Sequence, residues 1–180
     1  AEQKRLPQVI YWGTPLPASE DCAALAAAHT MDITGGMLDT NPELSICPEA
    51  SQSFPGQPGL ICRDAQGRVL RPNFRFEQEL TQDNSLCLTY ADKELGLTYE
   101  AHFELTASSN MLTCWSCLEA TQPLILNWLA APVFPAPQLS DTMMSFSGRW
   151  IGEFQTNSIP WRPGIHKRES RTGRSGHEHF

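Results

Sequence analysis

Apolar and polar residues alternate most regularly in the ten positions Leu97-Thr98-Tyr99-Glu100-Ala101-His102-Phe103-Glu104-Leu105-Thr106. Successive side chains of a β-strand point to opposite faces of a sheet, so this segment has one apolar face and one polar face. Such a segment is typical of an antiparallel strand that covers a core on one side and meets water on the other. We therefore expect a half-buried antiparallel strand over residues 97–106.

The flanking segments repeat this pattern and are separated by turn residues. Before it, Leu86, Leu88 and Tyr90 stand at alternate positions, and residues 92–96 supply a hairpin turn. After it, residues 108–110 supply a second turn that leads into an expected strand over residues 111–119. Turns about every 8–12 residues, with almost no helical period, indicate an all-β fold. We predict a two-layered antiparallel β-sandwich.

Shorter elements are expected on either side of this central region. The β-branched and aromatic run Val9 to Trp12 predicts a first strand, and the alanine-rich run Cys22 to Ala28 predicts one short helix with Ser19 as its N-cap. Residues 30–73 are expected to form loops with short strands between them. The run Leu124 to Leu129 is apolar on both faces, so we expect it to be buried between layers. Further strand-like runs lie at residues 143–146 and 150–156.

Length and composition fit one globular domain. The chain has 180 residues, of which 41% are hydrophobic and 18% charged. We assign residues 1–168 to the sandwich and the polar residues 169–180 to a connector. No run of about 18 apolar residues predicts a membrane span. The first five residues lack the apolar core of a signal peptide, although a cleaved one would leave no trace, so we expect a cytoplasmic protein.

The charge pattern argues against nucleic-acid binding. The net charge is −7, and six of the 13 basic residues are spread thinly over the last 32 positions. A phosphate backbone needs a denser basic surface than this. We therefore expect no nucleic-acid partner and no membrane partner.

The six cysteines are expected to be free and mostly buried. A chain of this length can build a core without disulfides, and a buried free cysteine acts as a small apolar side chain. Cys114 and Cys117 have the CxxC spacing of zinc ligands, but on a strand positions i and i+3 face opposite sides. We therefore expect no metal and no cofactor. His177 and His179 could form a metal pair by composition, but the sequence shows no third ligand.

The sequence shows no catalytic constellation. It contains no GxSxG, GxGxxG or HExxH motif, and most acidic residues lie in turns, such as Asp92 and Glu94, or on the polar face of a strand, such as Glu100. We expect these carboxylates to be solvated and this chain to hold no catalytic residue. What remains is a set of aromatic and arginine side chains suited to sugar rings. Arg63 and Trp150 are the candidate substrate-binding residues, and Trp161, His177 and His179 are candidates for an inter-domain contact.

Several blocks of sequence resemble the amino-terminal domain of glycoside hydrolase family 36. The early match is Tyr11-Trp12-Gly13 followed by Leu16, and a loop match is Phe54-Pro55-Gly56-Gln57-Pro58-Gly59-Leu60. Three linked blocks follow near the end: residues 147–154 (SGRWIGEF), 159–165 (IPWRPGI) and 169–179 (ESRTGRSGHEH). The resemblance covers nearly the whole chain. The Asp-Tyr-Arg-like element of many members is replaced here by Leu60-Ile61-Cys62-Arg63, so only Arg63 is carried over.

This resemblance implies a β-supersandwich that precedes a (β/α)₈ barrel. Family members are mostly α-galactosidases, so it implies retaining hydrolysis of terminal α-D-galactosyl residues, as in melibiose and raffinose, by two aspartates of the barrel. The implied partners are the protein's own barrel domain, α-galactoside oligosaccharides and further copies in a homo-oligomer. The alternative is a stand-alone carbohydrate-binding or protein-interaction β-sandwich, which the five tryptophans favour.

Overall fold

The computed structural model describes residues 5–28, 44–136, 140–149, 151–162 and 164–168. These residues form strands in antiparallel sheets, one short α-helix, α1 (Cys22–Ala28), and a single 3₁₀ turn, η1 (Ala50–Gln52). The chain divides into a first compact unit, Ala1–Pro135, and a second, Ala136–Phe180. The predicted all-β class with one short helix is confirmed. The expected boundary between residues 168 and 169 stays a prediction, because residues 169–180 lie outside the described part.

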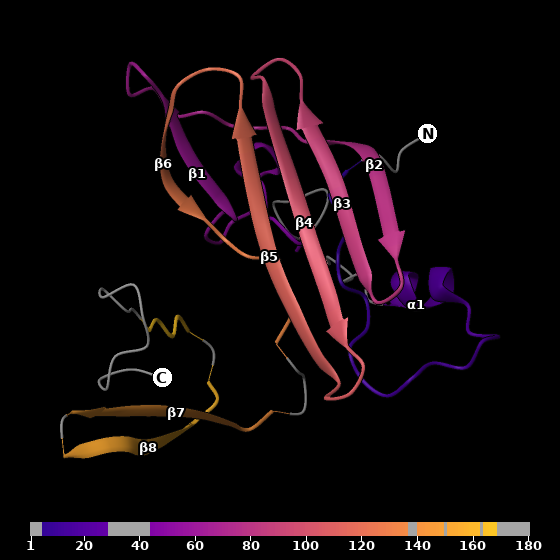
Figure 1. The fold of residues 1–180 in the computed structure, drawn as a ribbon, viewed down its shortest axis with the longest axis vertical. Helices are drawn as coiled ribbons and strands as arrows, with labels where there is room; N and C mark the ends of the chain where they lie inside the picture. The colour runs from indigo at the N-terminus through magenta and orange to yellow at the C-terminus, as the bar shows by residue number, and fades with distance from the viewer. Residues whose placement is uncertain (1–4, 29–43, 137–139, 150, 163, 169–180) are drawn as a thin grey trace, which may run out of the picture. The chain divides into compact units, whose positions relative to one another are not determined.

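The first unit contains a four-stranded antiparallel sheet in the order of the chain (Figure 1). Its strands are β2 (Arg75–Gln82), β3 (Ser85–Asp92), β4 (Leu97–Thr106) and β5 (Met111–Ala120). The expected alternation is confirmed in the first half of β4: Leu97, Tyr99 and Ala101 are buried, and the polar residues between them are more exposed. Towards the end of the strand the apolar face is not buried, and Leu105 is 42% exposed. Both predicted turns are present, between β3 and β4 and between β4 and β5.

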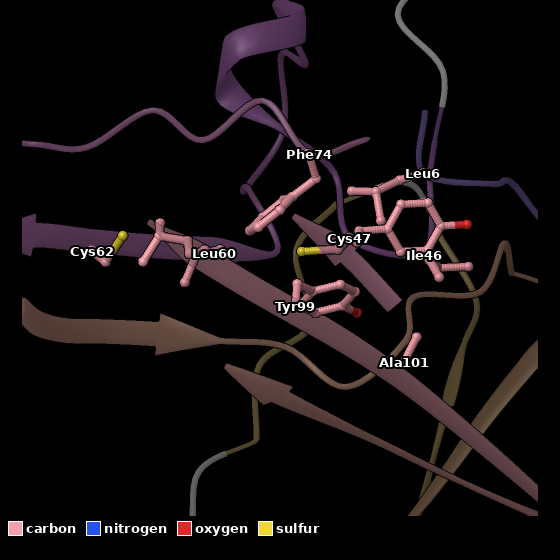
Figure 2. Close-up of a cluster of buried hydrophobic side chains, with 10 residues drawn as sticks. Leu6, Ile46, Cys47, Leu60, Cys62, Phe74, Tyr99 and Ala101 are labelled. Atoms are coloured by element: carbon pink, nitrogen blue, oxygen red, sulfur yellow. The ribbon is translucent and has the colours of Figure 1, made fainter. Parts of the chain in front are cut away.

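A smaller sheet shares a core with the large one. It pairs β1 (Leu60–Asp64) with β6 (Leu124–Leu129) in antiparallel register. Figure 2 shows Leu60 of β1 beside Tyr99 of β4, with Cys62 and Ala101 farther apart in the same cluster, together with side chains from connecting segments. The buried set is Leu6, Ile46, Cys47, Leu60, Cys62, Phe74, Tyr90, Leu97, Tyr99 and Ala101. Two sheets with one apolar core between them confirm the predicted sandwich.

The segment Val9 to Trp12 is not a strand, contrary to the sequence prediction. The only described pairing near it is an isolated bridge between Gln8 and Ser45. Beyond it the chain turns: the Tyr11 hydroxyl donates to the carbonyl oxygen of Thr14 at 2.8 Å, and the Trp12 ring meets Phe134 edge-on at 5.3 Å. Strand propensity therefore loses here to local turn and ring contacts.

The helix α1 forms where the sequence predicted it, but its N-cap is Asp21 and not Ser19. One carboxylate oxygen of Asp21 accepts the backbone N–H groups of Ala23 and Ala24, at 2.9 and 3.1 Å. Aspartate satisfies the amides that a first helical turn leaves without partners.

The strand β6 is mostly exposed, so the prediction that it is buried between layers is wrong. Ile125, Leu126 and Trp128 are 48%, 48% and 42% exposed, whereas Leu124 and Leu129 at its ends pack against the core. The physical reason is that β6 belongs to a two-stranded sheet, and no described residue covers its outer face.

The cysteines are free at all six positions, each of which is described. Cys47 and Cys62 are buried as expected, whereas Cys22 and Cys117 are exposed, which the sequence did not predict. Burial, followed by the nearby Glu49 charge, raises the pKa of Cys47 to about 12, so this thiol stays neutral and packs as an apolar group. Cys114 and Cys117 lie on opposite faces of β5, as predicted.

The second unit is built on an antiparallel hairpin of β7 (Thr142–Arg149) and β8 (Gly152–Pro160). The backbone N–H of Trp161 extends the pairing by donating to the carbonyl oxygen of Asp141 at 2.7 Å. Large apolar side chains are exposed here, among them Met144, Ile151 and Ile165. An isolated two-stranded hairpin buries little apolar area and is marginally stable at best. No helix among the described residues is long and apolar enough to cross a bilayer.

Candidate functional site

Arg63 lies on the exposed side of β1, beside the tight turn that follows the strand. Its Nη1 donates to the carbonyl oxygen of Gly67 at 3.0 Å. The turn itself is held by Asp64, whose Oδ1 accepts the N–H groups of Gln66 and Arg68 at 2.9 Å each. The Arg68 side chain donates to the other oxygen of Asp64 at 2.6 Å. Arg63 is thus braced against a rigid turn and keeps donors directed to solvent.

Trp161 belongs to the second unit and is 40% exposed. Its ring stacks on the imidazole of His166, with the ring centroids 5.7 Å apart and the planes at 27°. The Nε2 atom of His166 in turn lies 3.2 Å from the carbonyl oxygen of Arg162. Trp150, His177 and His179 lie outside the described residues, so their expected roles stay predictions.

The two buried carboxylates among the described residues are Glu49 and Asp92, and no sequence motif marks either of them. Glu49 Oε1 accepts the backbone N–H of Phe74, and Asp92 Oδ2 accepts that of Asn73, both at 2.8 Å. Asp92 Oδ1 accepts two more amides, from Glu94 and Leu95, at 3.0 and 2.9 Å. The expectation that Asp92 is a solvated turn residue is therefore wrong.

This pair holds the backbone and does not face a substrate. Glycoside hydrolysis needs one carboxylate to donate a proton and another to attack or to activate water, so each needs a free oxygen directed into a cleft. Both oxygens of Asp92 are occupied by backbone amides. The two carboxylates instead join the segment before β2 to η1 and to the β3–β4 turn. An Asx turn at the end of β3 was the available sequence signal for this role.

Burial raises the pKa of Glu49, and the Asp92 charge adds to this. The Phe74 N–H and the charges of Arg75 and Arg5 oppose the rise without cancelling it. The folded state therefore holds the proton to a higher pH than the unfolded chain, whose glutamate titrates near 4.5. The Glu49 contribution to stability is complete below that value and declines as the pH rises through the folded pKa.

We predict that Glu49→Gln removes this part of the pH dependence. Glutamine keeps an oxygen for the Phe74 N–H and carries no charge, so its stability relative to the wild type should increase as the pH rises from about 4.5 to neutrality. Urea unfolding at several pH values measures the difference. Glu94→Gln, an exposed glutamate of the β3–β4 turn, is the control and should follow the wild-type profile. A constant difference between Glu49→Gln and the wild type would contradict the prediction.

An apolar groove of about 870 Å³ lies within the first unit. The N-terminal segment, α1 and the core-side residues of β2 and β3 line it, including Ile10, Phe76 and Leu88. Among the described residues that line it, the charged ones are Arg5 and Glu79. One carboxylate alone cannot supply both the acid and the nucleophile of glycoside hydrolysis.

A third group of polar residues lies on the outer face of the large sheet. The strand register places Cys87 of β3 opposite His102 of β4, and His102 opposite Trp115 of β5. His102 Nε2 lies 3.0 Å from Glu100 Oε2 and 3.9 Å from Cys87 Sγ. The imidazole stacks flat on Trp115, with centroids 4.8 Å apart and planes at 4°. Glu100 was expected to be solvated, but its side chain is 35% exposed and paired.

Comparison with known proteins shows a family match over nearly the whole chain. Residues 5–180 match the family model of the glycosyl hydrolase family 36 N-terminal domain. Over 178 residues the chain is 26% identical to an alpha-galactosidase of Escherichia coli, in an alignment that covers 96% of this chain and 24% of that protein. The chain thus spans about a quarter of the length of the curated relative that it matches. No solved structure matches it.

The fold and the site define a β-sandwich domain whose two buried carboxylates, among the residues described, support the backbone. The family model extends over nearly all of this domain and of the second unit. The chain belongs to the glycosyl hydrolase family 36 N-terminal domain family, as the sequence resemblance implied.

Proposed function

We propose that the chain is the amino-terminal domain of an α-galactosidase that hydrolyses terminal α-D-galactosyl residues of oligosaccharides such as melibiose and raffinose. The observation that carries this proposal is the family match over residues 5–180. The relative named alpha-galactosidase supports it, and the 24% share of that protein leaves ample length for a separate catalytic domain. In this proposal the reaction is a retaining hydrolysis, and its two carboxylates lie in a barrel domain outside these residues.

The domain braces that barrel and forms part of the edge of its pocket. Supporting this role, the outer face of β6 and the second unit expose large apolar side chains, with Ile151 at 86% and Ile165 at 96%. We infer that these side chains are covered in the intact protein, since large exposed apolar patches mark interaction sites. Trp161, His177 and His179 are our candidates for the inter-domain contact, and Arg63 and Trp150 for contact with sugar. We also propose a homo-oligomer in the cytoplasm, where the free cysteines would stay reduced.

The division of labour predicts an inactive isolated chain and an active intact protein. The 180 residues alone should not hydrolyse p-nitrophenyl α-galactoside. Of the carboxylates that line the cleft beside the β3–β4 turn, Asp92 accepts three backbone amides and Glu77 is paired with Lys93. The intact protein should turn it over at an ordinary enzymatic rate, about 1–1000 per second. Release of p-nitrophenol measures both.

Two results would count against this proposal. Turnover by the isolated chain would place the catalytic groups within it. An intact protein without α-galactosidase activity would remove the substrate assignment, and tight binding of galactose or raffinose by the isolated chain in calorimetry would favour a carbohydrate-binding module instead.

A further inference from the structure

The outer face of the four-stranded sheet brings together three side chains of the types that bind transition metals. Cys87 comes from β3, whereas Glu100 and His102 come from the adjacent β4, as the neighbouring strands of Figure 1 show. One sulfur, one carboxylate oxygen and one ring nitrogen lie within 4.8 Å of one another. Glu100 and His102 share a face because they are two positions apart on one strand. Cys87 joins them because the register places it opposite His102.

The arrangement differs from a nucleophilic triad. In such a triad the base uses one ring nitrogen for the nucleophile and the other for the orienting carboxylate. Here both neighbours, Cys87 and Glu100, lie against the same nitrogen, Nε2 of His102. Coordination of a cation requires donor atoms that converge on one point, as these three do. A proton relay would instead use both ring nitrogens of His102, one for each neighbour.

The distances suit a metal ion after small side-chain movements. Ligands at about 2.0–2.3 Å from a tetrahedral zinc ion lie about 3.5 Å from one another. The Nε2–Oε2 and Nε2–Sγ separations, 3.0 and 3.9 Å, lie on either side of that value, and all three ligand atoms lie within 4.8 Å of one another. The flat contact with Trp115 limits rotation of the imidazole, so the ligand nitrogen is already oriented. The Glu100 and His102 side chains are 35% and 22% exposed, which leaves an ion a path from solvent.

We propose that Cys87, Glu100 and His102 form a binding site for a divalent transition-metal ion of the zinc class. A thiolate with an imidazole favours zinc or cobalt over magnesium or calcium, which prefer oxygen ligands. Three protein ligands leave a fourth position for water. The site lies wholly in the first unit and does not depend on the proposed glycosidase activity. This proposal departs from the sequence prediction that the chain binds no metal.

Cobalt titration of the intact protein that contains this chain tests the proposal, since Co²⁺ substitutes for Zn²⁺ and is coloured. After treatment with a chelator, added Co²⁺ should give the wild type a thiolate-to-cobalt charge-transfer band in the near ultraviolet. The band should saturate when the wild type has bound one more equivalent of cobalt per chain than the Cys87 and His102 variants bind. Added Zn²⁺ should displace it. Cys87→Ser should lose this band, and His102→Gln should weaken cobalt binding by about tenfold or more.

Cys117→Ser is the matched control. Cys117 is an exposed cysteine of β5, and the register places it opposite Glu100 of β4 on the same face of the sheet. It lies outside the cluster. Its substitution should leave the band and the stoichiometry unchanged. The proposal is overturned if the wild type shows no thiolate band, if Cys87→Ser keeps it, or if only Cys117→Ser removes it. Urea unfolding of each variant without metal separates loss of the site from loss of the fold.

Discussion

Leu97→Ala should lower the free energy of unfolding by about 2–5 kcal/mol, the cost of removing a buried leucine side chain and leaving a cavity. Leu97 is 2% exposed and begins β4, the strand that contributes three of the buried core residues. Domains of this size are commonly stable by only about 5–15 kcal/mol, so the variant should lose a large part of the total. Urea unfolding followed by tryptophan fluorescence measures the change.

Leu80→Ala provides a matched control, because the same atoms are removed from β2 at a position that is 50% exposed. Its expected cost is within about 0.5 kcal/mol. Equal losses at the two positions would mean that the face carrying Leu97, Tyr99 and Ala101 is not the core of the sandwich.

The strands predicted correctly are those whose side-chain pattern, turns and pairing partners lie close together in the sequence. In β3, β4 and β5 the alternation of side chains and the turns between them are contained in about 35 consecutive residues, and each strand pairs with its sequence neighbour. A hairpin register follows from the turn that closes it. The Asp92 to Gly96 turn illustrates this, since Gly96 takes a positive φ of 62° that glycine adopts readily.

The errors arise where the environment is set by distant residues. The apolar residues on both faces of Leu124 to Leu129 predict burial, but the partner of this strand is β1, about sixty positions earlier in the chain. Apolar residues indicate that a face is to be covered, but they do not indicate which part of the chain, or which other surface, covers it. At Val9 to Trp12 a local turn, closed by Tyr11 and Thr14, and the distant ring of Phe134 outweigh the strand propensity.

The candidate sites show the same limit. Both its chemistry and the family resemblance point to Arg63. The turn that braces it is held by the Asp64 side chain, which binds Gln66 and Arg68. The group formed by Cys87, Glu100 and His102 could not be found by spacing, because the cysteine lies 13 residues before the nearer ligand and only the β3–β4 register joins them. The Glu-x-His spacing of Glu100 and His102 is the part of this group that is visible in the sequence.

Asp92→Ala should destabilise the fold by about 3 kcal/mol, because three backbone amides lose a charged acceptor and two segments lose their connection. Asp92 holds its own turn through Glu94 and Leu95, and it holds the entry to β2 through Asn73. The loss should therefore appear as faster amide hydrogen exchange at all three of these residues, besides a lower urea midpoint. The stability of Asp92→Asn should lie between those of the wild type and Asp92→Ala. The carbonyl oxygen of asparagine can accept from the turn amides, whereas its NH₂ group faces the Asn73 N–H and cannot accept from it.

Asp21→Ala separates this effect from ordinary loss of a cap. Asp21 also accepts two backbone amides, but it caps an exposed seven-residue helix with no buried residue. Its removal should cost about 1 kcal/mol at most and should affect exchange in α1 only. If Asp92→Ala cost no more than Asp21→Ala, or if exchange at Asn73 were unchanged, the buried carboxylate would not join the two segments, and the reason for assigning it a structural role would be lost.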